Sequence, residues 1–314
     1  MRLVFALLAF LTFIQPATAA DDSNGKLTVL LDWFVNPDHA ALVVAKERGL
    51  FEEAGLDVEL IAPADPSAPP RLVAAGQGDI AVTYEPQLHM QIGEGLPLTR
   101  FATLVETPLN TLVVLRDGPV KSLADMKGHT VGFSVGGFED VLLKTMLKQE
   151  NLSLDDITLV NVNFALSQSL VAGKVDAVIG AFRNFELNQL DIEGHPGIAF
   201  YPEEHGVPVY DELVLVAKND RVDDPKLRRF VDALEKATLW LTNHPDEAWA
   251  LFIKSHGDLD DELNKRAWDD TLPRLAKRPG ALDRYRYERF AEFMKESGLI
   301  KQVPPLDSYA VELK

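Results

Sequence analysis

The chain has 314 residues, of which 31 are basic and 48 acidic, so its formal net charge is −17, and it contains no cysteine. A chain of this length is expected to fold as two lobes of about 100–200 residues each. The acidic balance argues against nucleic acid as a partner, because like charges repel. Without cysteine the chain forms no disulfide, no thiolate metal site and no thiol nucleophile.

Residues 1–20 have the three parts of a secretory signal peptide. Arg2 precedes an uncharged apolar run at 3–14, and Pro16 and the small residues 17–20 follow the run. The run is shorter than the roughly 20 residues that cross a bilayer. We therefore expect a cleaved leader and a periplasmic mature chain, with a retained membrane anchor as the alternative. Because no cysteine follows the cleavage region, a lipid-anchored lipoprotein is excluded.

Strand-like and helix-like segments alternate after the leader. Residues 26–33 predict a buried parallel strand, and residues 56–61 alternate in polarity and predict a second strand. Between them, Asn36 as an N-cap and Pro37 at the first helical position predict a helix that continues to residue 51.

One pattern then occurs twice in the chain, at residues 72–82 and again at 170–180. Each copy consists of a helix end, a glycine, an aspartate and an apolar strand. Gly76 and Gly173 are expected to end their helices, where a positive φ costs little only for glycine. We interpret the repeat as two α/β lobes of like topology, with chance similarity of two such units as the alternative.

The turn-rich residues 116–119 predict the point at which the chain crosses to the second lobe, and the strand-like residues 211–217 predict its return. Two crossings would form a hinge with a cleft between the lobes. From Pro225 onward the spacing is mostly helical, and we expect this tail in the first lobe. The expected organisation is a signal peptide at 1–20, lobe 1 at 21–116 and 214–314, and lobe 2 at 117–213.

In open α/β sheets, ligands bind beyond the carboxyl ends of the strands. The residues at these places are rich in aromatic rings and poor in basic groups, with Arg183 as the only cation nearby. Aromatic faces hold planar rings by stacking, and a carboxylate accepts hydrogen bonds from amino groups, so a strongly anionic ligand is disfavoured. The candidate ligand contacts are Trp33, Asn36, His39, Tyr84, Ser134, Gly136, Gly137, Phe182, Glu186 and Tyr210.

Several of these candidates also have a purely structural interpretation. Trp33, Tyr84 and Phe182 suit a hydrophobic core, and Glu186 suits a solvated helix face. The turn at 134–137 can present N–H groups to an oxygen, but it lacks the lysine of phosphate-binding loops and suits a plain tight turn as well.

No metal-binding motif of the His-Glu-x-x-His type is present, and the seven histidines are scattered. His244 and His256 lie near carboxylates in the sequence but are better explained as surface residues. We therefore expect a binding protein and not an enzyme, with no cofactor and no metal.

Residues 31–39 read Leu-Asp-Trp-Phe-Val-Asn-Pro-Asp-His. With residues 45–51, 74–79, 180–186 and 212–215, this run makes the chain resemble the periplasmic proteins that bind thiamine pyrimidine precursors. The broader group includes fungal thiamine pyrimidine synthases and taurine- and sulfonate-binding proteins. The Gly-Leu-Phe and Gly-x-x-Asp pieces mark only this superfamily, whereas Asp-Trp-x-x-Asn-x-x-His is more specific to the pyrimidine branch. The resemblance covers nearly all of the mature chain.

The resemblance implies an α/β, type II periplasmic binding protein fold, with two Rossmann-like lobes joined by a two-strand hinge. It also implies that Trp33 and Tyr84 stack on the ligand ring and that Glu186 binds its amino group. Auxiliary contacts would come from Asn36, His39 and residues 134–137.

The chain departs from this group in two ways. The fungal synthases carry a cysteine-rich iron-site motif, and this chain has no cysteine, which argues against an enzyme. Phe182 stands where relatives often place Tyr or Trp. That difference leaves open another flat heterocycle, such as riboflavin or a purine, and an alkyl or aromatic sulfonate also remains an alternative.

The expected function is the capture of an aminopyrimidine, either formylaminopyrimidine or hydroxymethylpyrimidine. A monomer would close on this ligand and deliver it to an inner-membrane ABC permease. The alternatives are a sensor domain that uses the same closure, and a pyrimidine synthase in which His39 takes part in chemistry.

Overall fold

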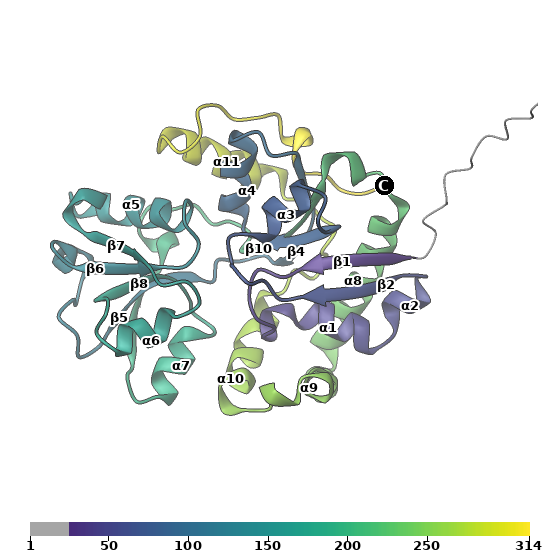
Figure 1. Ribbon diagram of the computed structural model, residues 1–314, viewed down its shortest axis with the longest axis horizontal. Coiled ribbons are helices and arrows are strands. Elements are labelled where there is room, and N and C mark those ends of the chain that lie inside the picture. Colours follow the sequence, from purple (N-terminus) through teal and green to yellow (C-terminus); the bar gives the residue numbers. More distant parts are fainter. Residues whose placement is uncertain (1–24) are drawn as a thin grey trace, which may run out of the picture.

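The computed structural model describes residues 25–314, and the predicted signal peptide at 1–20 lies outside them. Two lobes lie side by side, and each is built on a five-stranded sheet (Figure 1). Helices flank both sheets, which agrees with the predicted α/β class. Within the described part of the chain, no helix is long and apolar enough to cross a membrane.

The first sheet has the strand order β2-β1-β3-β10-β4. β1 is parallel to β2 and to β3, whereas β10 is antiparallel to β3 and β4. The carboxyl ends of β1 and β3 therefore open on the same edge of the sheet. The strands are β1 at Lys26–Leu30, β2 at Asp57–Ile61, β3 at Ile80–Thr83, β4 at Leu98–Val105 and β10 at Leu213–Lys218.

The second sheet has the order β7-β6-β8-β5-β9, which matches the first sheet position for position. The two copies of the repeated pattern end in β3 and β8, which occupy equivalent places. Gly76 and Gly173 precede them with φ of +77° and +65°, so the predicted glycine helix ends are confirmed. The strands are β5 at Asn110–Leu115, β6 at Thr130–Phe133, β7 at Thr158–Asn161, β8 at Ala177–Phe182 and β9 at Gly197–Phe200.

The position of β5 corrects the expected lobe boundary. β5 pairs with β8 and β9 of the second sheet, so the chain crosses between lobes at residues 106–109 and not at 116–119. The stronger turn signal of Asp117 and Gly118 is a turn inside the second lobe, in which the Gly118 N–H donates to the carbonyl of Leu115. The return crossing lies between β9 and β10, and each crossing strand is antiparallel to the repeat strand beside it.

The helices of the first lobe come from both ends of the chain. α8 and α9 of the tail pack against α1, and α11 packs against α4. The helix expected at 36–51 is divided, because Gly49 has φ +71° and separates α1 from α2. The helices of this lobe are α1 at Ala40–Glu47, α2 at Leu50–Glu53, α3 at Pro69–Ala74, α4 at Glu85–Gly93, α8 at Pro225–Asn243, α9 at Pro245–Ser255, α10 at Glu262–Thr271 and α11 at Arg284–Glu296.

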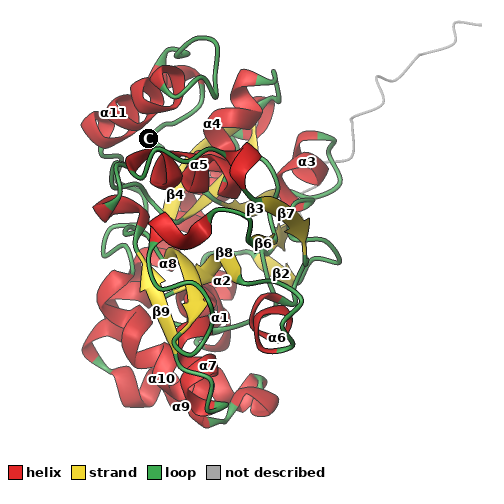
Figure 2. Cartoon of the chain, turned by 90° about the vertical axis from the view of Figure 1, so that its left-hand side faces the viewer, coloured by secondary structure: helices red, strands yellow, loops and turns green. Residues whose placement is uncertain are grey.

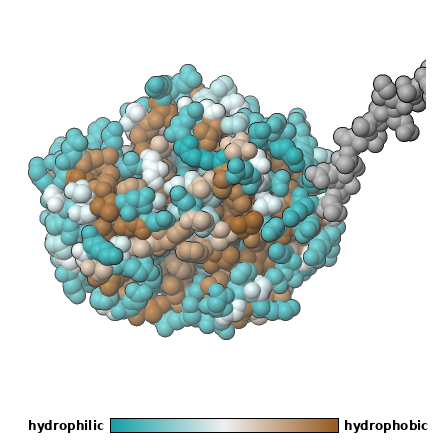
Figure 3. Space-filling view, viewed as in Figure 1, coloured by the Kyte–Doolittle hydropathy of each residue, from teal (hydrophilic) through white to brown (hydrophobic). Residues whose placement is uncertain are grey.

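The second lobe contributes α5 at Glu139–Gln149, α6 at Leu166–Val171 and α7 at Glu186–Ile192. Its helices meet the first lobe at two places, since α7 contacts α10 and the start of α5 lies near the start of α4 (Figure 2). The hydrophobic core of the first lobe continues into Val135 and Phe138 of the second lobe. The surface is continuous across the junction in the view of Figure 3. The structure is therefore the closed arrangement of the two lobes.

Candidate functional site

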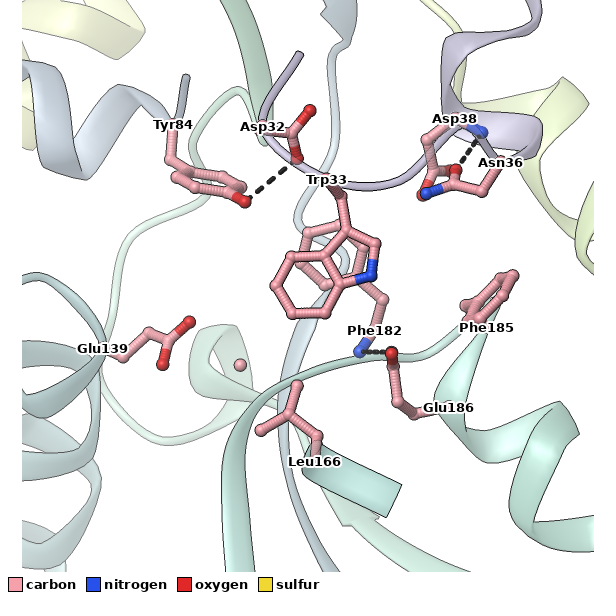
Figure 4. A pocket seen from close by; sticks show the side chains of 11 residues that line it. Asp32, Trp33, Asn36, Asp38, Tyr84, Glu139, Leu166, Phe182, Phe185 and Glu186 are labelled. Carbon is pink, nitrogen blue, oxygen red and sulfur yellow. Dashed lines mark hydrogen bonds between the residues drawn. The ribbon is translucent and has the colours of Figure 1, made fainter. Parts of the chain in front are cut away.

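A small cavity lies between the two lobes (Figure 4). Residues after β1 and β3 form one wall. Residues after β6 and β7, and residues at and after the end of β8, form the other, as expected from the carboxyl ends of the strands. The first lobe contributes Asp32, Trp33, Asn36, Asp38 and Tyr84, and the second contributes Glu139, Leu166, Gly180, Phe182, Phe185 and Glu186.

The segment after β1 is held in shape by its own helix cap. The side chain of Asn36 accepts a hydrogen bond from the backbone N–H of Asp38 at 2.8 Å, and Pro37 starts a short 3-10 helix. This cap holds the preceding loop at the cavity, so that the Trp33 ring lies in the middle of the site (Figure 4). The Trp33 ring also contacts the ring of Phe164 from the second lobe, with centroids 4.6 Å apart.

Asp32 is engaged by two donors of its own lobe. The hydroxyl of Tyr84 donates to Oδ2 of Asp32 at 2.9 Å, and Nε2 of His39 lies 2.9 Å from Oδ1. His39 is fully buried and reaches the cavity only through Asp32. Burial, followed by the Asp32 charge, raises the pKa of Tyr84 well above its usual value. Tyr84 is therefore a protonated donor at neutral pH, and it fixes the Asp32 carboxylate.

Asp38 joins the two lobes. Its Oδ1 accepts hydrogen bonds from Nδ2 of Asn184 at 2.7 Å and from Oγ1 of Thr271 at 3.0 Å. Asn184 follows β8 in the second lobe, whereas Thr271 ends α10 in the first. Burial raises the pKa of Asp38 from 3.8 to about 6, although the neighbouring His39 and both hydrogen bonds act to lower it.

Two glutamates of the second lobe complete the acidic lining. Glu186 is the first residue of α7, and its Oε2 accepts the backbone N–H of Phe182 at 2.6 Å. Glu139 is the first residue of α5, and its Oε2 accepts the backbone N–H of Ser134 at 2.8 Å. Burial raises the pKa of Glu186 to about 7 and that of Glu139 well above its usual range.

Aromatic rings surround these acids. Tyr84 stacks on Phe138 across the junction of the lobes, with centroids 4.9 Å apart, and meets the edge of Phe182 at 6.4 Å. Among residues 25–314, none that lines the cavity is Lys, Arg or His. Arg183, the one cation expected nearby, pairs instead with Glu203 at 2.6 Å. The cavity therefore combines flat apolar faces with acceptors of hydrogen bonds.

Half of the residues predicted as ligand contacts line this cavity, namely Trp33, Asn36, Tyr84, Phe182 and Glu186. The other five do not, and the structure gives a reason for each. His39 supports Asp32, and Tyr210 is fully buried beside Phe290.

The turn at 134–137 does not present its N–H groups to the cavity as expected. Glu139 accepts the N–H of Ser134, and the hydroxyl of Ser134 donates to the carbonyl of Asn163. Gly136 is exposed outside the cavity, and Gly137 packs against Met90 of the first lobe. Ser134, Gly136 and Gly137 are therefore not contacts of this cavity.

Residues 132–136 also read Gly-x-Ser-x-Gly, the motif of many hydrolase nucleophiles, between a strand and a helix. The expectation of a non-enzyme overlooked this match. A nucleophilic serine needs an exposed hydroxyl beside a general base. Ser134 is 3% exposed, and its hydroxyl donates to a main-chain carbonyl, so the geometry does not support this role.

Six residues that line the cavity are absent from the list of candidate ligand contacts, namely Asp32, Asp38, Glu139, Leu166, Gly180 and Phe185. Glu139 and Phe185 follow β6 and β8, so the strand-end rule could have found them. Asp38 lies in the short helix that Asn36 caps, so its sequence position suggested a structural role. Leu166 is apolar, and nothing in its sequence position distinguished it from a core residue. Across residues 25–314, the structure contains no group of three or more His, Asp or Glu side chains that could hold a metal ion.

The sequence is similar to those of known proteins. The profile described as NMT1/THI5 like matches residues 36–248. A Haemophilus influenzae protein named for thiamine biosynthesis is 55% identical over 290 residues, which cover 92% of each chain. The formylaminopyrimidine-binding protein of Halalkalibacterium halodurans is 34% identical over 281 residues, which cover 88% of this chain and 85% of that one.

The fold can be compared with a solved structure. The alkanesulfonate-binding protein of Xanthomonas axonopodis pv. citri bound to MOPS matches with a TM-score of 0.72 at 16% identity, over 91% of this chain and 98% of that chain. At this identity the likeness concerns the fold alone, and it confirms the expected periplasmic binding protein fold. The profile match and the two sequence relatives settle the family: the chain belongs to the NMT1/THI5-like family.

Proposed function

We propose that this protein is an exported solute-binding protein that captures an aminopyrimidine precursor of thiamine and delivers it to an inner-membrane ABC permease. The observation that carries the proposal is the cavity between the lobes, which has aromatic faces, buried carboxyl groups and no basic lining residue. A planar ring that carries an amino group has the complementary chemistry, because its faces are apolar and its edge donates hydrogen bonds.

Each part of such a ligand has a partner in the cavity. Trp33 and Tyr84 offer aromatic faces from the first lobe, and Glu186 offers a buried carboxyl group from the second. A ligand held by both lobes stabilises the closed arrangement, which is the form that a permease would recognise. The name of the Halalkalibacterium relative supports formylaminopyrimidine, one of the two expected ligands, as the first to test.

The proposal places the protein in the periplasm as a monomer. The sequence pattern of residues 1–20 supports export, since it has the parts of a cleavable signal peptide. The fold shared with the alkanesulfonate-binding protein supports a role in solute capture.

The acidic lining disfavours an alkyl sulfonate as the ligand. A sulfonate is anionic, and it would meet Asp32, Asp38, Glu139 and Glu186 without a cation on the cavity wall.

The resemblance to fungal thiamine pyrimidine synthases raises a second candidate function, that of an enzyme. His39 would be its reactive residue, but this side chain is fully buried and bonded to Asp32.

Isothermal titration calorimetry tests the proposal with two variants and a matched control. Glu186→Gln should weaken aminopyrimidine binding roughly 10- to 100-fold, because a hydrogen bond to a charged group is lost. Trp33→Ala should weaken it as well through the loss of a stacking face. Glu193→Gln makes the same change at the exposed end of α7 and should leave affinity unaltered. Equal affinity of Glu186→Gln and the wild type would contradict the proposed role of Glu186.

A further inference from the structure

The Trp33 ring packs against the second lobe, although its backbone belongs to the first. It lies against the hydrophobic cluster that includes Leu166, Leu170 and Val178, and every other member of that cluster belongs to the second lobe. Phe164 of the second lobe adds an edge-to-face contact, in which the two ring planes meet at 68°. The stacking face of Trp33 is therefore held in place by contacts that form when the lobes close.

Phe164 also contacts a second ring of the first lobe, that of Phe34. The centroids of Phe34 and Phe164 lie 4.5 Å apart, whereas those of Trp33 and Phe34 lie 6.3 Å apart. Phe164 is thus closer to each of the two first-lobe rings than these rings are to each other. We call Trp33, Phe34 and Phe164 together the aromatic clasp.

The aromatic clasp extends from the cavity to the surface of the protein. Trp33 lines the cavity, Phe164 is half-buried, and 53% of Phe34 is exposed. Separation of the lobes would expose more of each ring to water, which is unfavourable in proportion to the apolar area exposed. The clasp therefore favours the closed form, and it does so beside the face on which a ligand would stack.

The loops that carry the two phenylalanines are fixed by their own hydrogen bonds. Nδ2 of Asn36 donates to the carbonyl of Phe34 at 3.1 Å. The residue before Phe164 is Asn163, which has φ +51°, a conformation that asparagine tolerates. The Asn163 N–H donates to Oδ1 of Asn161 at 2.8 Å. Closure therefore brings together rings that are already oriented, and little conformational entropy is lost in forming the clasp.

We infer that Phe164 is a positioning residue, which holds the Trp33 ring against the ligand in the closed form and, with Phe34, slows the reopening that releases the ligand. The inference rests on the proposed function, in which Trp33 stacks on the ligand ring. Phe164 lies outside the set of residues that line the cavity, so it acts through Trp33 and not by touching the ligand. Because the clasp forms on closure, it affects ligand release more than ligand entry.

Stopped-flow fluorescence on the mature chain tests the inference by measuring both rate constants. The probes are formylaminopyrimidine and hydroxymethylpyrimidine. In Phe164→Ala, which loses two ring contacts, we expect the dissociation rate constant to rise roughly 5- to 50-fold. The association rate constant should stay within about threefold of the wild type. Phe164→Tyr keeps a ring at this position and should bring the dissociation rate constant back to within about threefold of the wild type.

A double-mutant cycle tests whether Phe34 and Phe164 act together. Phe34→Ala alone should raise the dissociation rate constant roughly 2- to 12-fold, because one ring contact is lost. In the Phe164→Ala background the same change should have little further effect, since its partner ring is already absent. Phe293→Ala is the matched control, because it removes a half-buried ring that contacts Phe290 within α11 of one lobe. Both of its rate constants should equal those of the wild type.

The possible failures are distinguishable. An unchanged dissociation rate constant in Phe164→Ala, an equal rise in Phe293→Ala, or effects of Phe34 and Phe164 that simply multiply would overturn the clasp while the proposed function stands. If Phe164→Ala does not fold, Phe34→Ala at its exposed position decides the question in the same way. If the wild-type protein binds neither aminopyrimidine, the proposed function fails and this inference fails with it.

Discussion

Burial dominates the chemistry of the single carboxyl groups in the cavity. It raises the pKa of Asp38 to about 6 and that of Glu186 to about 7, and it is the largest cause in both cases. A charged carboxylate is costly in a space with few water contacts. Burial therefore favours the protonated form of both groups, and hydrogen bonds donated to their oxygens act in the opposite direction.

The raised pKa of Glu186 predicts how stability depends on pH. The folded protein binds this proton more tightly than the unfolded chain, so the free energy of unfolding falls as pH rises from 4.5 to about 7. Glu186→Gln removes this titration and should make the fall shallower in the same window. Urea denaturation of the ligand-free protein at a series of pH values measures the slope. Parallel slopes for the variant and the wild type would show that Glu186 titrates normally.

Tyr84 allows a test of the support given to Asp32. Tyr84→Phe keeps the ring that stacks on Phe138 but removes the donor to a buried carboxylate. We expect the free energy of unfolding to fall by about 1–3 kcal/mol at neutral pH, because Asp32 loses one of its partners. Tyr285→Phe is the control, since Tyr285 is 73% exposed. The account is contradicted if chemical denaturation gives the same small change for both variants.

At the residue scale, the sequence could predict side chains whose place follows from local order. Trp33 lies shortly after β1, and Glu186 starts a helix shortly after β8, so the strand-end rule placed both at the cavity. The turn at 134–137 failed this rule, because Glu139 supplies the acceptor for its N–H. The sequence of the turn does not show that the Glu139 carboxyl group accepts the N–H of Ser134, which was expected to face a ligand.

At the scale of elements, the contact between the start of α7 and the end of α10 holds the lobes together. Asn184 donates to Asp38 and to Thr271, so one side chain of the second lobe binds two of the first. Asn184→Ala removes both bonds and leaves a buried carboxyl group with one donor fewer. The closed arrangement should therefore be destabilised relative to an open one.

Two measurements check the effect of Asn184→Ala. Small-angle X-ray scattering of the ligand-free variant should give a larger radius of gyration than the wild type, and saturating ligand should remove the difference. The affinity of the variant for its ligand should fall roughly 3- to 30-fold, because a smaller fraction of the ligand-free variant is in the closed form that binds. Gln189→Ala is the control, since Gln189 bonds to Glu193 within α7. Identical scattering of the variant and the wild type would show that this contact does not bias closure.

Sequence reasoning assigned β5 to the first lobe, whereas it belongs to the second. Its central residues Leu112, Val113 and Val114 are buried and apolar, and such a strand fits either sheet equally well. The choice depends on pairing with β8 and β9, which lie far along the chain. The tail helices were easier to predict, because the spacing of apolar residues in α8 to α11 is a local property.

At the scale of the whole molecule, the two lobes share one strand order and close on one cavity. Both lobes supply aromatic rings and carboxyl groups to the cavity wall. A ligand must contact both lobes, so its binding free energy is coupled to closure. The repeat in the sequence predicted the like topology of the lobes, but the closed contact between them required the structure.

The most direct test of this account is a thermal-shift panel on the mature chain from residue 21. The ligands are formylaminopyrimidine, hydroxymethylpyrimidine, thiamine, riboflavin, purines and alkyl sulfonates. A ligand that binds only the folded state adds about 2.7 kcal/mol of stability at a hundredfold excess over its dissociation constant. We predict a rise in melting temperature with an aminopyrimidine and none with a sulfonate. A shift with a sulfonate, riboflavin or a purine, and none with either aminopyrimidine, would contradict the central claim.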